Sequence, residues 1–278
     1  MISRRTSGIV LSVSDHGESD KLVTFLSPDI GRATGIAKGA KRSKQRFVNK
    51  LEPFSLLRLM YRTGRNGGLL FLSEAELANA FFLLRQRYDC FVVAMFACEL
   101  VLHFTREQDP DPAIFFLLLW LLQALESGRD PLQVAALFHL RLLGAAGYQP
   151  KLDSCGLCSE PIRPGRSYTL QPGSGLLACD RCRHDLPEAA ASLSVQTLKF
   201  LYKAQAVDLH HLDRLRLPRR TADETLLILY RYTRHLLQHD INSWRQLRGL
   251  RATAEQPGDL RRRLKTAAGT RKSGRGRR

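Results

Sequence analysis

GIVLSVSDHGESDKLVTFLSPDIGRATGIAK, residues 8–38, decides the fold at the start of this 278-residue chain. Three short runs rich in Val, Ile, Leu and Phe (8–13, 21–27 and 32–38) alternate with the turn-forming stretches DHGESD and SPDIG. Such runs, bounded by Gly, Pro, Asp and Ser, are typical of β-strands. Two further runs occupy 53–61 and 68–77, and Asn66-Gly67-Gly68 before the last predicts a hairpin turn.

This rhythm predicts a small antiparallel β-barrel over residues 1–80. Five short strands joined by one longer connection, from Lys38 to Lys50, match the size of an OB-fold. The alternation alone also fits an SH3-like barrel.

From about residue 81 the pattern becomes helical, which predicts an all-α domain over 81–245 and an α+β fold class for the chain. A long apolar stretch runs from Phe82 to Phe104. Later helix starts are marked by capping signals: Asp111-Pro112, Asp130-Pro131, Ser194, and the capping box Thr221-Ala222-Asp223-Glu224.

The charge is strongly positive, since 43 Lys and Arg against 26 Asp and Glu give +17. Such a balance favours polyanionic partners, either nucleic acid or an anionic membrane face. The last 18 residues, 261–278, contain nine Lys or Arg and no acid, so the rest carries 17 − 9 = +8. Residues 246–278 are predicted to be a disordered basic tail.

The apolar runs are too short for membrane insertion. The longest, Ala113–Leu122, has ten residues, whereas a spanning helix needs about 20. The N-terminus has basic residues before apolar ones, but no small-residue cleavage site follows. We therefore expect a cytoplasmic protein without a membrane partner.

Four of the six cysteines form two CxxC pairs, Cys155/Cys158 and Cys179/Cys182. Two such loops can place four thiolates around one tetrahedral ion, so the segment 152–185 is predicted to be an inserted module with one structural Zn²⁺. The alternatives are four ordinary buried thiols or a redox motif, and the latter lacks a surrounding βαβ pattern. Cys90 and Cys98 lie in an apolar stretch and are expected to pack.

No motif supports catalysis. HExxH, GxSxG and the Walker A pattern are absent from the sequence. The one HxE segment, His16-Gly17-Glu18, lies in a turn, and Ser154 and Ala178 stand where a deaminase has proline before its CxxC. We expect no enzyme activity.

The long connection of the predicted barrel is basic throughout. It contains six cations with no acid between them: Lys38, Lys41, Arg42, Lys44, Arg46 and Lys50. Barrel loops of this kind commonly bind nucleic acid, so DNA or RNA contact is predicted; the alternative is a solvated loop. Most aromatic residues of this region are expected in the core, which leaves backbone charge as the main attraction.

Residues 8–57 resemble the RecO family of bacterial DNA repair proteins. The resemblance is carried by the Glu18/Asp20 turn, Gly31-Arg32, Ala37-Lys38-Gly39-Ala40, Leu51-Glu52-Pro53-Phe54, and FHLRLLGAAGYQP at 138–150. It covers about residues 1–240 and implies an OB-fold, a helical domain and, in members with four cysteines, a zinc module.

The resemblance also implies a function. RecO proteins are non-enzymatic recombination mediators that bind single- and double-stranded DNA and anneal complementary strands. With RecR they help to load RecA onto strands coated by single-strand-binding protein, which implies a nucleoid-associated location. The implied DNA-contacting positions are Arg32, Lys38, Lys41, Arg42, Lys44, Arg46 and Lys50.

One implied contact departs from the family pattern. The basic pair expected just before Phe138, for the acidic tail of single-strand-binding protein, is here Ala136-Leu137, with Arg141 as a substitute. The competing class is an RNA-binding or ribosome-associated protein with the same barrel and zinc site, and a zinc enzyme is a third. Relative affinity for DNA and RNA, and turnover that depends on the metal, separate these classes.

Overall fold

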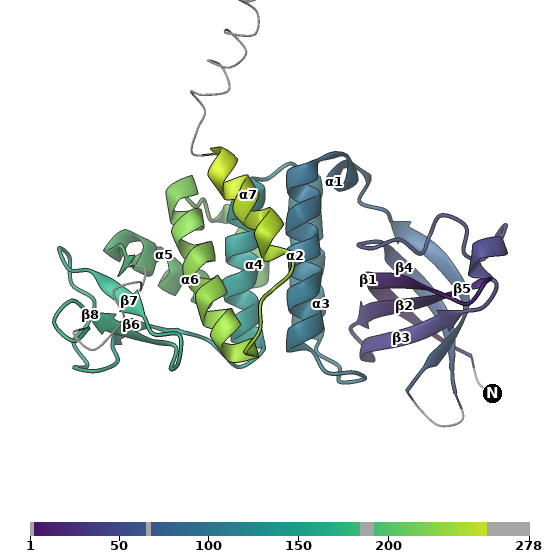
Figure 1. Cartoon of the computed structure of the whole chain (residues 1–278), viewed down its shortest axis with the longest axis horizontal. Coiled ribbons are helices and arrows are strands. Elements are labelled where there is room, and N and C mark those ends of the chain that lie inside the picture. The colour runs from purple at the N-terminus through teal and green to yellow at the C-terminus, as the bar shows by residue number, and fades with distance from the viewer. Residues whose placement is uncertain (1–2, 65–67, 184–191, 255–278) are drawn as a thin grey trace, which may run out of the picture.

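The computed structural model describes residues 3–64, 68–183 and 192–254. A β-barrel lies at one end of the molecule, a small second sheet lies at the other, and a group of helices separates them (Figure 1). Asn66 and Gly67 of the predicted hairpin turn fall outside the described residues. The prediction of a disordered tail is wrong for residues 246–254, which belong to helix α7 (Trp244–Ala254), and residues 255–278 lie outside the described part of the chain.

The barrel confirms the predicted OB-fold. Its strands are β1 (Arg4–His16), β2 (Asp20–Ser27), β3 (Gly31–Ala37), β4 (Leu56–Thr63) and β5 (Leu70–Asn79), closed in the order β1-β2-β3-β5-β4. Successive neighbours pair antiparallel, while β3 and β5 pair parallel where the barrel closes. This closure distinguishes the OB arrangement from an SH3-like barrel. The barrel interior is filled by residues such as Val10, Phe25 and Leu59, all fully buried.

Helices begin with α1 (Phe82–Gln86) and α2 (Tyr88–Phe104). The others are α3 (Pro112–Glu126), α4 (Pro131–Ala145), α5 (Val195–Ala206), α6 (Arg219–Leu237) and α7 (Trp244–Ala254), with short 3-10 turns η1 (Ala40–Arg42) and η2 (Leu209–Arg214). Three predicted caps are confirmed: Asp111 accepts from the Ala113 and Ile114 amides, Asp130 from that of Gln133, and Ser194 from that of Thr197. Within the described residues, no helix is both long and apolar enough to span a membrane.

Two helix predictions were wrong. The stretch 82–104 is interrupted at Arg87, whose φ of −111° and ψ of 114° are extended. The capping box at Thr221 does not form, because α6 begins earlier, after Pro218. Glu224, its expected partner, instead accepts a hydrogen bond from the Thr197 hydroxyl and pairs with Arg220.

The second sheet has the strands β6 (Lys151–Cys155), β7 (Tyr168–Leu170), β8 (Leu176–Cys179) and β9 (Ser192–Leu193), in the order β6-β8-β7-β9. Tyr168 and Leu177 are buried, and they belong to the same apolar core as the helices. The sheet is therefore packed into the helical region rather than tethered to it.

The barrel is fixed to the helical region at close contacts. A Cβ on Gly31 would lie 2.2 Å from the carbonyl oxygen of Asp109, and the residue has a φ of 72°, so only glycine fits. The neighbouring Gln108 amide donates to the Arg32 carbonyl at 2.7 Å. On another side, Arg85 of α1 donates to the Pro53 carbonyl at 2.6 Å. The two parts are thus held in one orientation.

Candidate nucleic-acid interface and metal centre

The connection between β3 and β4 carries the predicted cations on an ordered backbone. Ala40, Phe47 and Leu51 are buried in the barrel core. The Asp20 carboxylate accepts a hydrogen bond from the Gly39 amide at 2.8 Å, and this bond lowers the pKa of that carboxyl. The loop is anchored along its length, so its charges have a fixed base.

The six cations of this loop are not equivalent. Four are exposed and make no ion pair in the part of the chain that the structure describes: Lys38, Arg42, Lys44 and Arg46. Lys41 is engaged, because its Nζ lies 2.9 Å from Asp15 and donates to the Gly17 carbonyl. The Nζ of Lys50 donates to the carbonyls of Gln45 and Arg46. The four cations without an ion pair form a set that we call the loop quartet; within it, Arg46 donates one hydrogen bond to the Lys38 carbonyl at 3.4 Å.

Arg32 lies apart from this loop. It stands near the start of β3, whereas Lys38 follows the end of that strand, and six residues of strand span about 20 Å. Arg32 is half-buried, its Nε has no hydrogen-bond partner, and its backbone bridges Glu107 in the helical region. Arg32 is therefore not part of the group of cations on the loop, and its implied DNA contact stays a prediction.

Phe71 is an additional surface residue that the sequence reasoning did not single out. Phe25, Phe47, Phe54 and Tyr61 are buried as expected, but Phe71 is 37% exposed on the outside of β5. The Lys38 Nζ lies 5.6 Å from its ring centroid. Strict alternation along β5 was the available signal, since its neighbours Leu70 and Leu72 both point inward.

The four predicted cysteine ligands meet at one point. The Sγ atoms of Cys155, Cys158, Cys179 and Cys182 lie within 4.8 Å of one another, and no other such group of three or more His, Cys, Asp or Glu occurs in the described residues. Cys155 ends β6 and Cys179 ends β8, so two paired strands bring the CxxC loops together. Four converging sulfurs fit one tetrahedral metal ion.

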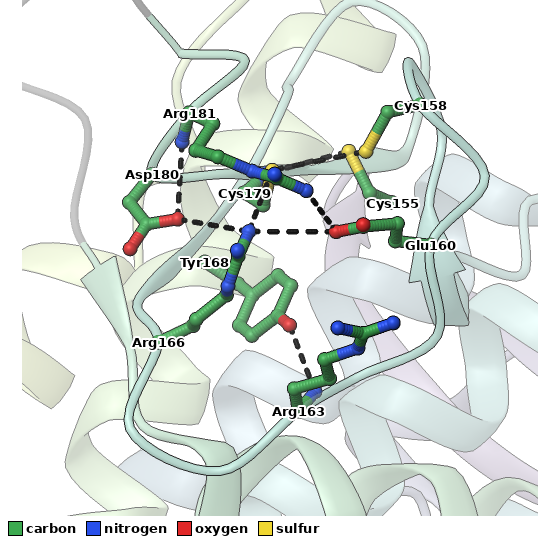
Figure 2. A network of polar contacts seen from close by, with 9 residues as sticks. All are labelled: Cys155, Cys158, Glu160, Arg163, Arg166, Tyr168, Cys179, Asp180 and Arg181. Carbon is green, nitrogen blue, oxygen red and sulfur yellow. Dashed lines mark hydrogen bonds and ion pairs between the residues drawn. The ribbon is translucent and has the colours of Figure 1, made fainter.

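Charged side chains surround this cluster (Figure 2). Arg166 contacts the Cys179 sulfur at 4.0 Å and pairs with Glu160 and Asp180 at 3.5 and 3.6 Å. Arg181 forms a second ion pair with Glu160 and lowers the pKa of its carboxyl. The two arginines offset the negative charge that four thiolates bring to a divalent ion.

Backbone amides favour ionisation of part of the cluster. Burial opposes a thiolate at Cys155, yet the amides of Cys158, Cys179 and Leu157 outweigh it and lower its pKa to about 6. Because four sulfurs complete a tetrahedral shell, such a site leaves no position for a substrate and serves the fold. Cys90 and Cys98 lie away in α2, where burial raises their thiol pKa values to about 11 and 12.

Arg141 has a structural task that the sequence did not reveal. One guanidinium nitrogen donates to the carbonyls of Ala204, Gln205 and Val207, at the end of α5. The side chain also borders a pocket of about 240 Å³, whose mixed lining includes Leu117, Leu140 and Leu209 beside Gln149 and Gln205. Ala136 and Leu137 are fully buried, so neither position could carry an exposed charge.

An OB-type barrel joined to a helical region with a four-cysteine cluster is an architecture typical of nucleic-acid-binding proteins. The family described as Recombination protein O N terminal matches residues 1–81, and Recombination protein O C terminal matches residues 85–245. The chain therefore belongs to the RecO family, and its role is in DNA repair and recombination.

Individual relatives agree. The DNA repair protein RecO of Syntrophobacter fumaroxidans is 35% identical over 254 residues, covering 91% of this chain and 100% of the relative. That of Syntrophus aciditrophicus is 31% identical over 247 residues, covering 88% and 95%. That of Anaeromyxobacter sp. is 35% identical over 203 residues, covering 72% and 78%.

Proposed function

We propose that this chain is a non-enzymatic, cytoplasmic recombination mediator associated with the nucleoid. It binds single- and double-stranded DNA, anneals complementary strands and, with RecR, helps to load RecA onto strands coated by single-strand-binding protein. The observation that carries the proposal is the loop quartet: four exposed cations without ion pairs on an anchored barrel loop. Phosphate groups are the complement of such a row.

Strand binding begins with charge and is supplemented by stacking. The loop quartet attracts the sugar-phosphate backbone, which carries no sequence information. Phe71, with Lys38 beside it, offers a ring face on which one base stacks. The protein then holds a strand independently of its sequence, which annealing requires.

The metal in the four-cysteine cluster is proposed to be one zinc ion. Zinc prefers four-coordinate thiolate sites, and closed sites of this type stabilise a fold. The ion would fix the two CxxC loops, which follow the parallel strands β6 and β8, on the helical core without taking part in strand exchange.

Single-strand-binding protein is proposed to dock through its acidic tail at the pocket bordered by Arg141. Three carbonyls already use one nitrogen of this guanidinium, which has further N–H groups for a carboxylate. The leucines in the lining of the pocket suit a hydrophobic residue in the same tail.

The deciding experiment is annealing of complementary strands coated by single-strand-binding protein, with and without RecR. The proposal expects faster annealing with this chain than without it, and RecA loading that requires RecR. RNA strands of the same length serve as the comparison. Preferential RNA binding without DNA annealing would favour the ribosome-associated alternative, and turnover that disappears with the metal would favour an enzyme.

A further inference from the structure

Residues 212–220 run from the end of η2 through a short extended stretch into the start of α6, with leucines buried and arginines exposed. Leu212, Leu215 and Leu217 are 0%, 8% and 6% exposed. Four exposed arginines lie between and after these leucines, together with Asp213 and Pro218: Arg214, Arg216, Arg219 and Arg220. We call these four residues the arginine ribbon.

Side chains of the helical core hydrogen-bond to the backbone of this segment. Arg129 donates to the Leu215 carbonyl at 3.1 Å and Gln133 to the Leu217 carbonyl at 3.0 Å. Asp213 accepts from the Trp120 indole at 3.0 Å and also pairs with Arg129. The segment is therefore ordered before any ligand arrives, which removes one entropic cost of binding.

Two members of the arginine ribbon form ion pairs, and the other two do not within the described residues. Arg219 lies 3.7 Å from Asp130 and Arg220 lies 3.2 Å from Glu224. For Arg214 and Arg216 the described residues provide no ion-pair partner. The nearest acid in sequence, Asp213, is already paired with Arg129.

The chemistry of the surface favours a phosphate backbone over a protein. Arg214, the last residue of η2, and Arg216, in the extended stretch after it, are two residues apart, a separation of at most about 7 Å. This spacing is comparable with that of successive phosphates of an extended strand, and the guanidinium fork fits phosphate oxygens. Protein interfaces have an apolar core, yet no large apolar side chain is exposed between residues 207 and 220. The ribbon leads into α6, on the far side of α2 and α3 from the barrel (Figure 1).

We propose that the arginine ribbon is a second phosphate-binding surface, which holds one nucleic-acid strand while the barrel loop holds another. The proposal rests on the proposed annealing function and gives it a geometry: two strands bound to one rigid molecule at separate surfaces. The ligand class is single-stranded nucleic acid.

The test uses full-length protein with Arg214→Ala and Arg216→Ala combined. The matched control is Lys199→Ala with Lys203→Ala, which removes equal charge from exposed positions of α5. One labelled oligonucleotide is bound first, and capture of a second, non-complementary one is then measured by energy transfer. We expect first-strand affinity to change by less than about 2-fold, second-strand capture to fall about 10-fold, and its salt slope to fall by about 1.4 units.

Several outcomes would overturn the proposal. Second-strand capture that is unchanged in the ribbon variant would overturn it, and so would an equal fall in capture for the α5 control. So would a ribbon variant that loses binding to an acidic peptide rather than to DNA. The charge-preserving variant, Arg214→Lys with Arg216→Lys, should restore capture, which separates lost charge from misfolding. Replacing the loop quartet distinguishes the two proposals: if first-strand binding survives that change but not the ribbon change, the barrel assignment fails and the ribbon is the primary site.

Discussion

The Glu99 carboxylate of α2 accepts hydrogen bonds from the Ser243 amide, at 2.8 Å, and from the Ser243 hydroxyl. It also accepts from the amide of Asn242, so one carboxylate satisfies the N-terminus of α7 from 144 positions away. A negative charge near the N-terminus of a helix interacts favourably with the positive end of the helix dipole. The contact fixes α7, the last described helix, onto α2.

Replacing Glu99 with Ala should therefore destabilise the fold by about 1–3 kcal/mol, because the buried Ser243 just before α7 loses the acceptor of its amide and hydroxyl hydrogen bonds. Chemical denaturation measures the loss, and Glu99→Gln, which keeps an acceptor without the charge, should lose less. Equal stability of all three proteins would show that α7 is held by its apolar face alone.

Replacing the loop quartet of Lys38, Arg42, Lys44 and Arg46 with Ala should lower the salt slope of single-strand binding by about 3 units, since each contact contributes about 0.7. Titrations at several salt concentrations give the slope. The control is Lys41→Ala with Lys50→Ala, two cations that are already bonded to other groups of the barrel domain, which should alter the slope much less. Identical slopes for quartet and wild type would make the loop a solvated surface.

Cys182→Ser should abolish binding of one metal ion per chain and lower the melting temperature, because ligation energy in a closed site is folding energy. Elemental analysis and calorimetry check both effects. Cys98→Ala, at a buried cysteine of α2, should keep the ion. A folded, purified wild type without metal would contradict the assignment.

The buried His139 should make the stability of the helical core sensitive to acid. Burial lowers the pKa of this imidazole to about 3, from 6.5 in the unfolded chain, while its Nε2 lies 2.7 Å from the Thr233 hydroxyl. Below pH 6.5 the unfolded state takes up a proton that the folded state does not, so stability is full above 6.5 and falls as the pH falls. Between pH 7 and 5 the loss is about 2 kcal/mol.

The measurement is the difference between wild type and His139→Gln in unfolding free energy at each pH. Other titrating groups, including the cysteine cluster, cancel in that difference. The wild type should lose stability faster than the variant as acid is added. Parallel curves would mean that the imidazole takes up its proton in the folded state just as it does in the unfolded state.

Deleting residues 261–278 should weaken DNA binding at low salt and matter progressively less as salt rises. The segment contributes nine cations and no acid, and exposed charges are screened over about 8 Å at physiological ionic strength. Annealing by the truncated chain should persist. Loss of annealing even at low salt, in a folded truncation, would place the strand-binding site in the tail.

The sequence predicted features whose causes are local. Asp111 and Asp130 cap their helices because the cap and its amides lie within three residues. The CxxC spacing likewise determines how two sulfurs approach one ion, and the structure brings all four together.

The missed features depend on distant partners. The break at Arg87 follows a short helix whose Leu83 and Leu84 amides donate to Glu126, more than 40 positions away. Glu224 is drawn to Thr197 on another helix, which no capping pattern contains. Lys41 and Lys50 look like their neighbours in the sequence, and only the folded loop shows that their charges are in use.

The contact between Gly31 and Asp109 has a mechanical consequence. A hinge motion between the barrel and the helices would need free space at this turn. A Cβ at residue 31 would lie only 2.2 Å from the Asp109 carbonyl oxygen, so the turn has no such space. The distance between the barrel loop and the arginine ribbon is then fixed by the fold of the chain and stays constant. Strands held at its two ends would meet by their own flexibility, without domain closure.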